Sequence, residues 1–196
     1  AASAPHTSDG QFIYPGTCRN LTEDERRSKM QSHKHSWRIK VPDETVTFND
    51  RHYGRQSLNL AREWGDFIVR RSDGIYAYQL AVVIDDALMG VTEVIRGRDL
   101  LSSSAPQLYL YRLLGFKPPQ FGHLPLLTAP DGRRLAKRDM DLDMGALRSR
   151  YTPEEVIGRL AFLAGLIDKE EPVKASELLP SFDWQKIPKE NITVTN

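Results

Sequence analysis

The chain has 196 residues, of which 40% are hydrophobic and 27% charged. These are ordinary values for a globular protein that can bury a sizeable core. The formal net charge is +1, so any nucleic-acid-binding face must be a local patch. No apolar run approaches the roughly 20 residues of a membrane span, and the first ten residues lack the pattern of a secretory signal. A single cysteine, Cys18, excludes an internal disulfide framework and suits a reducing compartment. We therefore expect a cytoplasmic protein with no membrane partner.

The first part of the chain alternates between loops and short elements. Residues 1–20 are rich in proline, glycine and small polar residues, which predicts a loop. Three acids follow Thr22, which predicts a helix that runs to about Gln31. Residues 36–50 alternate well enough for two short strands around a Pro-Asp turn. Residues 52–64 are polar and contain glycine, so we expect a connecting loop there.

A hairpin is the expected structure of the next segment. Residues 66–71 and 75–84 are both β-rich, and a Ser-Asp-Gly turn separates them. The second run is continuously apolar, which is typical of a strand inside a covered sheet. Residues 91–97 predict a further strand. Three serines then precede Pro106, and the apolar period predicts a helix that ends near Gly115.

The last third predicts a turn and one well-marked helix. Residues 130–132 read Pro-Asp-Gly and predict a turn between two short segments. Thr152, Pro153 and Glu155 form the pattern of an N-cap, a first-turn proline and a capping-box glutamate. One face of this helix would carry four apolar residues, namely Val156, Leu160, Leu163 and Ile167. Strands mixed with helices indicate an α/β fold, although no glycine-rich phosphate loop of either common type is present.

A dense group of cations follows that turn, within GRRLAKRDMD at residues 132–141. The four cations are Arg133, Arg134, Lys137 and Arg138. They could form a solvated turn, because three aspartates follow closely and neutralise much of the charge. They could equally form a loop that binds phosphates. The residues alone leave both interpretations open.

Three linked segments resemble the second half of the catalytic domain of glutamyl-tRNA synthetases. They are AYQLAVVIDDALMGVTEVIRGRDLL, LYRLLGFKPPQFGHLPLL and PDGRRLAKRD, in matching order and spacing. The resemblance implies an α/β fold, the second half of a class I synthetase Rossmann-type domain with an inserted acceptor-like subdomain. Residues 1–35 would be the remainder of a zinc-binding insertion and a helix. Residues 36–145 would be the catalytic half, and residues 146–196 a short helical C-terminal region.

The short ending and the opening HTSDGQFIYPGTCRN look like a truncated branch of this superfamily, the glutamyl-Q tRNA(Asp) synthetases. That resemblance implies ATP-dependent activation of glutamate and its transfer to the queuosine base of tRNA(Asp), by a monomer. Two alternatives stay open: a truncated glutamyl-tRNA synthetase that charges tRNA(Glu), and a non-catalytic RNA-binding relic. The chain starts at Ala1 and lacks the family's His-x-Gly-His-type motif, so we expect the first half of the active site to lie upstream.

The resemblance also implies roles for individual residues. Lys137 matches the second lysine of the family's Lys-x-Ser-Lys-type loop, and it would contact the phosphates of ATP, which enters with Mg²⁺. Arg134 stands in place of the first lysine and would also bind ATP, while Ala136 replaces the serine. Tyr78 and Arg96 match the glutamate-binding tyrosine and arginine. A guanidinium can hold a carboxylate through two parallel hydrogen bonds.

Tyr14 and Cys18 match two ligands of the family's structural zinc site, whose Cys-x-Cys pair is absent from this chain. From the residues alone, Cys18 is more simply a lone buried thiol. His6, His33 and His35 could be rival zinc ligands, although His33 and His35 are more simply part of a solvated polar run. Asp85 and Asp86 are expected at the end of an apolar strand, where they could position tRNA or the basic loop, or equally cap a helix. His123 is expected to be a hydrogen-bonded core histidine rather than an acid or base.

Overall fold

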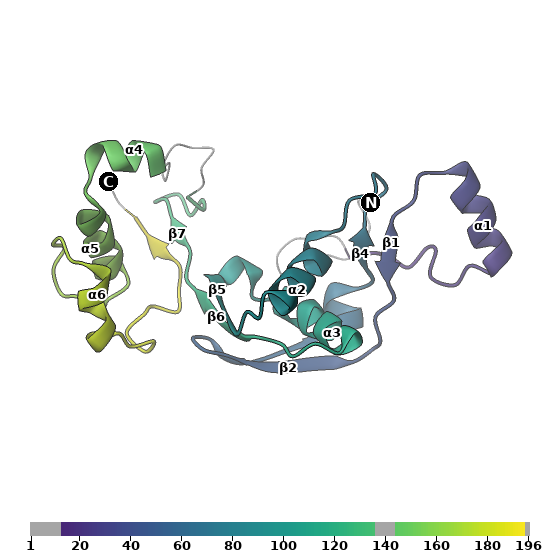
Figure 1. The fold of residues 1–196 in the computed structure, drawn as a ribbon, viewed down its shortest axis with the longest axis horizontal. Coiled ribbons are helices and arrows are strands. Elements are labelled where there is room, and N and C mark those ends of the chain that lie inside the picture. Colours follow the sequence, from purple (N-terminus) through teal and green to yellow (C-terminus); the bar gives the residue numbers. More distant parts are fainter. Residues whose placement is uncertain (1–12, 136–143, 195–196) are drawn as a thin grey trace. The chain divides into compact units, whose positions relative to one another are not determined.

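The computed structural model describes residues 13–135 and 144–194 (Figure 1). These residues form two compact units. The first contains the residues up to Asp50, Gly54–Val94 and Asp99–Phe121, and the second contains Arg51–Tyr53, Ile95–Arg98 and the residues from Gly122 onward.

The first unit contains two antiparallel strand pairs. Strand β1 (Trp37–Ile39) pairs with β4 (Phe67–Arg70), and β2 (Thr45–Asp50) pairs with β3 (Gly54–Asn59). The strands predicted within residues 36–50 are thus confirmed, although each pairs with a later strand. Helix α1 (Glu23–Ser32) begins at the predicted N-cap, because the Thr22 hydroxyl and the Glu25 carboxylate form a capping box.

The prediction of a loop at residues 52–64 is wrong. Strand β3 and a π-helix, η1 (Leu60–Trp64), occupy most of this segment. The β2 and β3 strands pair in register from Thr45 with Asn59 to Asp50 with Gly54. The polar residues of β3 were misleading because this pair has one solvated face, which polar side chains cover.

The prediction of a strand at residues 75–84 is also wrong. Residues Tyr78–Leu88 form helix α2. The expected hairpin is short, with a bridge between Arg70 and Tyr76 and backbone hydrogen bonds from Arg71 to Ile75 and from Ala77 to Val69. A continuous apolar run does not distinguish a strand from a buried helix by its period. Here the run contains good helix formers, and α2 packs beside helix α3 (Ser104–Leu114) (Figure 1).

Helix α3 confirms the prediction of a helix ending near Gly115. Gly115 follows the last helical residue with a φ of 69°, a left-handed conformation that favours glycine. The helix carries much of the first unit's core. The buried apolar residues of that core are Val41, Leu60, Trp64, Phe67, Val83, Ala105, Tyr109, Leu110 and Tyr111.

Two strands lead from the first unit into the second. Strand β5 (Glu93–Gly97), which confirms the prediction for residues 91–97, pairs with β6 (Gln120–Leu124). A short 3-10 helix, η2 (Arg98–Leu100), follows β5 directly. Strand β5 carries Arg96, and β6 carries His123.

The second unit contains a parallel strand pair and three α-helices among its described residues. Strand β7 (Leu127–Thr128) pairs with β8 (Ile192–Thr193). The helices are α4 (Met144–Arg150), α5 (Pro153–Leu163) and α6 (Ala175–Leu178), and the 3-10 helix η4 (Leu179–Ser181) follows the last of them. Helix α5 has the predicted capping box between Thr152 and Glu155, and it ends before Ile167. Within the described ranges, no helix has the length and apolar character needed to cross a membrane.

Replacing Gly158 with alanine should destabilise the second unit. A Cβ at this position of α5 would lie 1.8 Å from the carbonyl oxygen of Glu171 and 2.8 Å from its carbonyl carbon. Alanine normally stabilises a helix by about 1 kcal/mol relative to glycine, but this clash with backbone should reverse the sign and cost about 2 kcal/mol net. Thermal and urea unfolding measure the change.

The matched control is Gly90→Ala, whose Cβ would meet nothing within 4 Å although φ is +71°. The Gly90→Ala protein should be destabilised only by the cost of placing alanine in a left-handed conformation, about 1 kcal/mol. A Gly158→Ala protein as stable as the parent would contradict the close packing of α5 on the Glu171 backbone.

Candidate functional site

The base of the basic loop is a hairpin built on β7. The Ala129 N–H donates to the Arg133 carbonyl at 2.8 Å, and the Leu135 N–H donates to the Leu127 carbonyl at 3.0 Å. Gly132 closes the turn with a φ of 82°, and its N–H donates to the Ala129 carbonyl at 2.9 Å. The predicted turn is therefore confirmed, and it leads the chain directly into the cationic residues.

The described cations of this loop lie at the surface. Arg133 donates its backbone N–H to Asp131 at 2.9 Å, and its Nε lies 3.8 Å from the same carboxylate. Arg134 is exposed, and its backbone forms an antiparallel β-bridge with Thr128 of β7. Lys137, Ala136 and Arg138 lie outside the described residues, so their predicted roles stay predictions.

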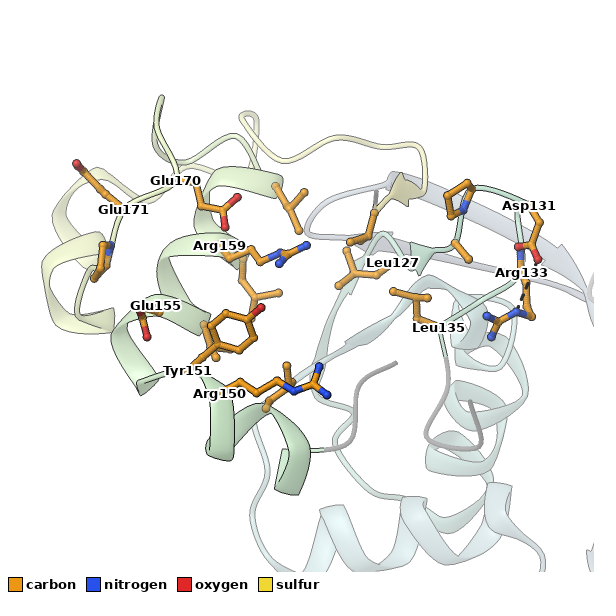
Figure 2. Close-up of a pocket in the computed structure, with 18 residues that line it drawn as sticks. Leu127, Asp131, Arg133, Leu135, Arg150, Tyr151, Glu155, Arg159, Glu170 and Glu171 are labelled. Atoms are coloured by element: carbon orange, nitrogen blue, oxygen red, sulfur yellow. Dashed lines mark hydrogen bonds and ion pairs between the residues drawn. The ribbon is translucent and has the colours of Figure 1, made fainter. Parts of the chain in front are cut away.

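A cavity of about 990 Å³ lies beside this hairpin, entirely within the second unit. Figure 2 shows Arg150, Tyr151 and Arg159 of the helical side across from Leu127, Leu135 and Arg133. The apolar face predicted for α5 lines it with Val156, Leu160 and Leu163. Both signs of charge are present, since Glu155, Glu170 and Glu171 also line the cavity.

Arg96, the predicted glutamate-binding arginine, lies on β5 and is partly buried. Its Nε donates a hydrogen bond of 3.0 Å to Nε2 of His123. His123 lies on β6 and is completely buried, which confirms the expectation of a hydrogen-bonded core histidine. The guanidinium is therefore anchored by its Nε edge.

Tyr78 is the first residue of α2, and its side chain is 53% exposed. It belongs to the first unit, whereas Arg96 belongs to the second. Asp85 and Asp86 lie within the same helix, so the prediction that they end a strand is wrong. Their positions inside a helix, rather than at the carboxyl end of a strand, remove the reason for assigning them a ligand.

The predicted zinc ligands Tyr14 and Cys18 lie next to each other. The Cys18 N–H donates to the Tyr14 hydroxyl at 2.7 Å. Burial, and then the hydrogen bond with Cys18, raises the pKa of the Tyr14 hydroxyl. Within residues 13–135 and 144–194, no three His, Cys, Asp or Glu side chains gather as a metal site. Structural zinc takes four ligands, so these two side chains do not form a complete site by themselves. Cys18 is exposed, so the expectation of a buried thiol is wrong.

The segment that carries these two residues is anchored to the first unit. Arg19 pairs with the buried carboxylate of Asp66, which also accepts the Val41 N–H at 2.9 Å. The side chain of Ile13 packs against Gly65, where a Cβ would come within 2.6 Å of the isoleucine Cγ2. Tyr14 and Cys18 are thus held in place by contacts to either side.

A basic groove of about 500 Å³ lies in the first unit, between the end of α1 and the turn after β4. Its charged lining residues are cationic, and an exposed tryptophan, Trp37, lies among them. The basic residues along it are His33, Lys34, His35, Arg70 and Arg71. Cations beside an exposed aromatic ring suit a nucleic-acid strand, since the backbone and a base can both be bound.

The sequence predictions missed the groove and the cavity. The sequence indicates that His33 and His35 belong to a solvated polar run, and both are exposed. Arg70 and Arg71 lie about 35 residues further on, so only the β1–β4 pairing brings them near. The available signal for the cavity is the apolar face predicted for α5.

The family model for the catalytic domain of class I tRNA synthetases (E and Q) matches residues 4–195. A protein of Symbiobacterium thermophilum named Glutamyl-Q tRNA(Asp) synthetase is 52% identical over 98% of this chain. A Nitratidesulfovibrio vulgaris protein of the same name is 49% identical over 85% of the chain. The matches cover 60% and 52% of those relatives, so the chain spans little more than half their length.

Solved structures show the same similarity. A glutamate tRNA ligase from Elizabethkingia meningosepticum, in complex with its amino acid, is 29% identical with a TM-score of 0.74. The glutamate-tRNA synthetase from Elizabethkingia anophelis is also 29% identical, with a TM-score of 0.75. Each comparison covers 95% of this chain and 43% of the other. The mixed α/β fold therefore agrees with the sequence prediction.

Proposed function

The chain belongs to the catalytic-domain family of the class I tRNA synthetases for glutamate and glutamine, and from this we propose that it is part of a glutamyl-Q tRNA(Asp) synthetase. The proposed enzyme activates glutamate with ATP and transfers it to the queuosine base of tRNA(Asp). The observation that carries the proposal is the 52% identity, over 98% of this chain, to a relative of that name.

In the first proposed step, the carboxylate of glutamate attacks the α-phosphate of ATP. A carboxylate–phosphorus bond forms, pyrophosphate leaves, and negative charge develops on the phosphate oxygens. Lys137 and Arg134 would stabilise that charge, since preorganised cations act most strongly where charge develops. The hairpin of β7 supports this role for Arg134, because it presents that residue at the surface.

Arg96 and Tyr78 would bind the glutamate substrate. Arg96 offers a guanidinium on a strand, where its direction is fixed better than on a loop. Tyr78 offers an exposed hydroxyl at the start of a helix. No side chain of the enzyme needs to act as a nucleophile, because the substrate carboxylate attacks the phosphate itself.

In the second proposed step, the glutamyl group passes to queuosine and AMP leaves. The basic groove along His33, Lys34, Arg70 and Arg71, with Trp37 beside it, supports contact with tRNA. Phosphate contacts of this kind release counterions, so tRNA affinity should fall as the salt concentration rises.

We propose that the protein acts as a cytoplasmic monomer. We also propose that its domains are residues 1–35, 36–145 and 146–196.

Two metal ions belong to the proposal. Mg²⁺ would accompany ATP as a part of the substrate. Zinc would be held by Tyr14 and Cys18 together with two ligands that this chain does not contain, and its role would be structural. The Tyr14 hydroxyl lies beside Cys18, where it accepts the backbone N–H and forms a hydrogen bond with the side chain, and this supports the zinc assignment. None of the reaction steps passes through zinc.

A transfer assay tests the proposed function. The full-length protein that carries this chain is given ATP and labelled glutamate with one of three RNAs. These are tRNA(Asp) containing queuosine, tRNA(Asp) lacking it, and tRNA(Glu). We expect label only on the queuosine-containing tRNA(Asp).

Each other outcome favours a stated alternative. Label on tRNA(Glu) would show a discriminating glutamyl-tRNA synthetase in place of the modification enzyme. Absence of label on every RNA, together with tRNA binding, would favour the non-catalytic RNA-binding relic. The 196-residue chain is assayed in parallel, and we expect it to be inactive because it lacks the His-x-Gly-His-type motif.

A further inference from the structure

Arg96 and His123 form an anchored pair on neighbouring strands. The bond from Arg96 Nε to His123 Nε2 is 3.0 Å long, and the histidine has no exposed surface. Gly122, the residue before it, is also tightly packed, since a Cβ there would approach Ile95 Cδ1 to 2.8 Å and a Trp184 ring carbon to 3.1 Å. His123 therefore lies in a close-packed part of the second unit.

The direction of this hydrogen bond follows from the chemistry of its donor. A guanidinium can only donate, so Nε2 of His123 is the acceptor of the Arg96 Nε–H. With its Nε edge committed to His123, Arg96 would meet a carboxylate bidentately through its two Nη nitrogens.

We propose that His123 is a positioning residue for substrate binding. Its imidazole holds the guanidinium of Arg96 in the orientation that binds a carboxylate of glutamate, without touching the substrate itself. The inference rests on the proposed function, because it assumes that Arg96 binds glutamate. An unanchored arginine would lose side-chain entropy on binding its ligand, and the buried acceptor removes part of that cost in advance.

The test compares two substitutions of His123 in the full-length protein, assayed by glutamate-dependent exchange of pyrophosphate into ATP. His123→Leu removes the acceptor, whereas His123→Gln keeps an acceptor oxygen at a similar reach. The leucine variant should raise the KM for glutamate about tenfold, the scale of one hydrogen bond to a charged group. The KM for ATP should stay near the parent's value, and glutamine should restore most of the affinity for glutamate.

His52→Gln is the matched control. His52 is also a buried histidine of the second unit, and its Nε2 bonds to the carbonyl of Pro188 at 3.1 Å. It should lower the melting temperature without changing the ratio of the two KM values. A similar rise in both KM values for His123→Leu would show a merely structural role and overturn the proposal.

A double-mutant cycle keeps the test decisive if His123→Leu does not fold. Arg96→Lys and His123→Asn are measured alone and together, because asparagine keeps a polar amide but is too short to place its oxygen at the position of Nε2. Positioning predicts that His123→Asn raises glutamate KM less in the Arg96→Lys background than in the parent, and additive effects would overturn it. If Arg96→Lys leaves glutamate KM unchanged, then the proposed role of Arg96 fails. If it raises KM but no His123 variant does, only the positioning role fails.

Discussion

Replacing Lys137 with alanine should slow the formation of glutamyl-adenylate by about a hundredfold or more, the typical cost of losing one preorganised charge-stabilising group. The reason is that negative charge grows on the phosphates as pyrophosphate leaves, and Lys137 is proposed to meet that charge. The effect should fall on the rate rather than on the KM for glutamate. Pyrophosphate exchange and single-turnover adenylate formation measure it.

Arg133→Ala is the control for this substitution. It removes the same charge from the same segment, but Arg133 already pairs with Asp131 on the turn, so we expect a much smaller effect. An unchanged exchange rate in Lys137→Ala would reject the role of Lys137. Equal losses in both variants would show that only the summed charge of the segment matters.

Replacing Arg96 with lysine should raise the KM for glutamate at least about tenfold, because an ammonium cannot form the two parallel bonds of a guanidinium with a carboxylate. Lysine also lacks the Nε–H that reaches His123 in the parent. The KM for ATP should change little. Titration of each substrate against a saturating concentration of the other separates the two constants.

The control for Arg96→Lys is the same substitution at Arg112. That guanidinium forms bonds of 2.6 and 2.8 Å with both oxygens of Glu44, an exposed pair in the first unit. Arg112→Lys should leave both KM values near those of the parent. Equal losses of glutamate and ATP affinity in Arg96→Lys would contradict the assignment of Arg96 to glutamate.

Local chemistry made some elements predictable from the sequence. The capping boxes of Thr22 and Thr152 begin helices α1 and α5, because each hydroxyl and its glutamate satisfy backbone N–H groups within four residues. Gly115 ends α3 in the same local way. These signals need no knowledge of the tertiary structure.

Local signals did not predict which strands pair or which structure a continuous apolar run forms. The sequence predicts two strands within residues 36–50, but the partner of the second, β3, lies in a segment whose polar residues indicate a loop. Helix α2 was mistaken for a strand because its continuous apolar run carries no clear period. In both cases the tertiary packing decides the structure.

In the candidate site, too, the sequence suggested single residues, whereas their contacts depend on the tertiary structure. The resemblance to a known family suggested Arg96, but no pattern in the sequence linked it to His123, 27 residues later. That contact depends on the pairing of β5 with β6. The basic groove likewise depends on strand pairing, because β1 and β4 bring Trp37 to the level of Arg70.

In the proposed reaction, glutamate is attached to queuosine and not to the 3′ terminal adenosine of the tRNA. The most direct measurement offers the full-length protein labelled glutamate, ATP and queuosine-containing tRNA(Asp) from which the terminal adenosine has been removed. The proposed function predicts labelling equal to that of intact tRNA(Asp). Loss of the label on the shortened tRNA would place the glutamate at the 3′ end and contradict the claim.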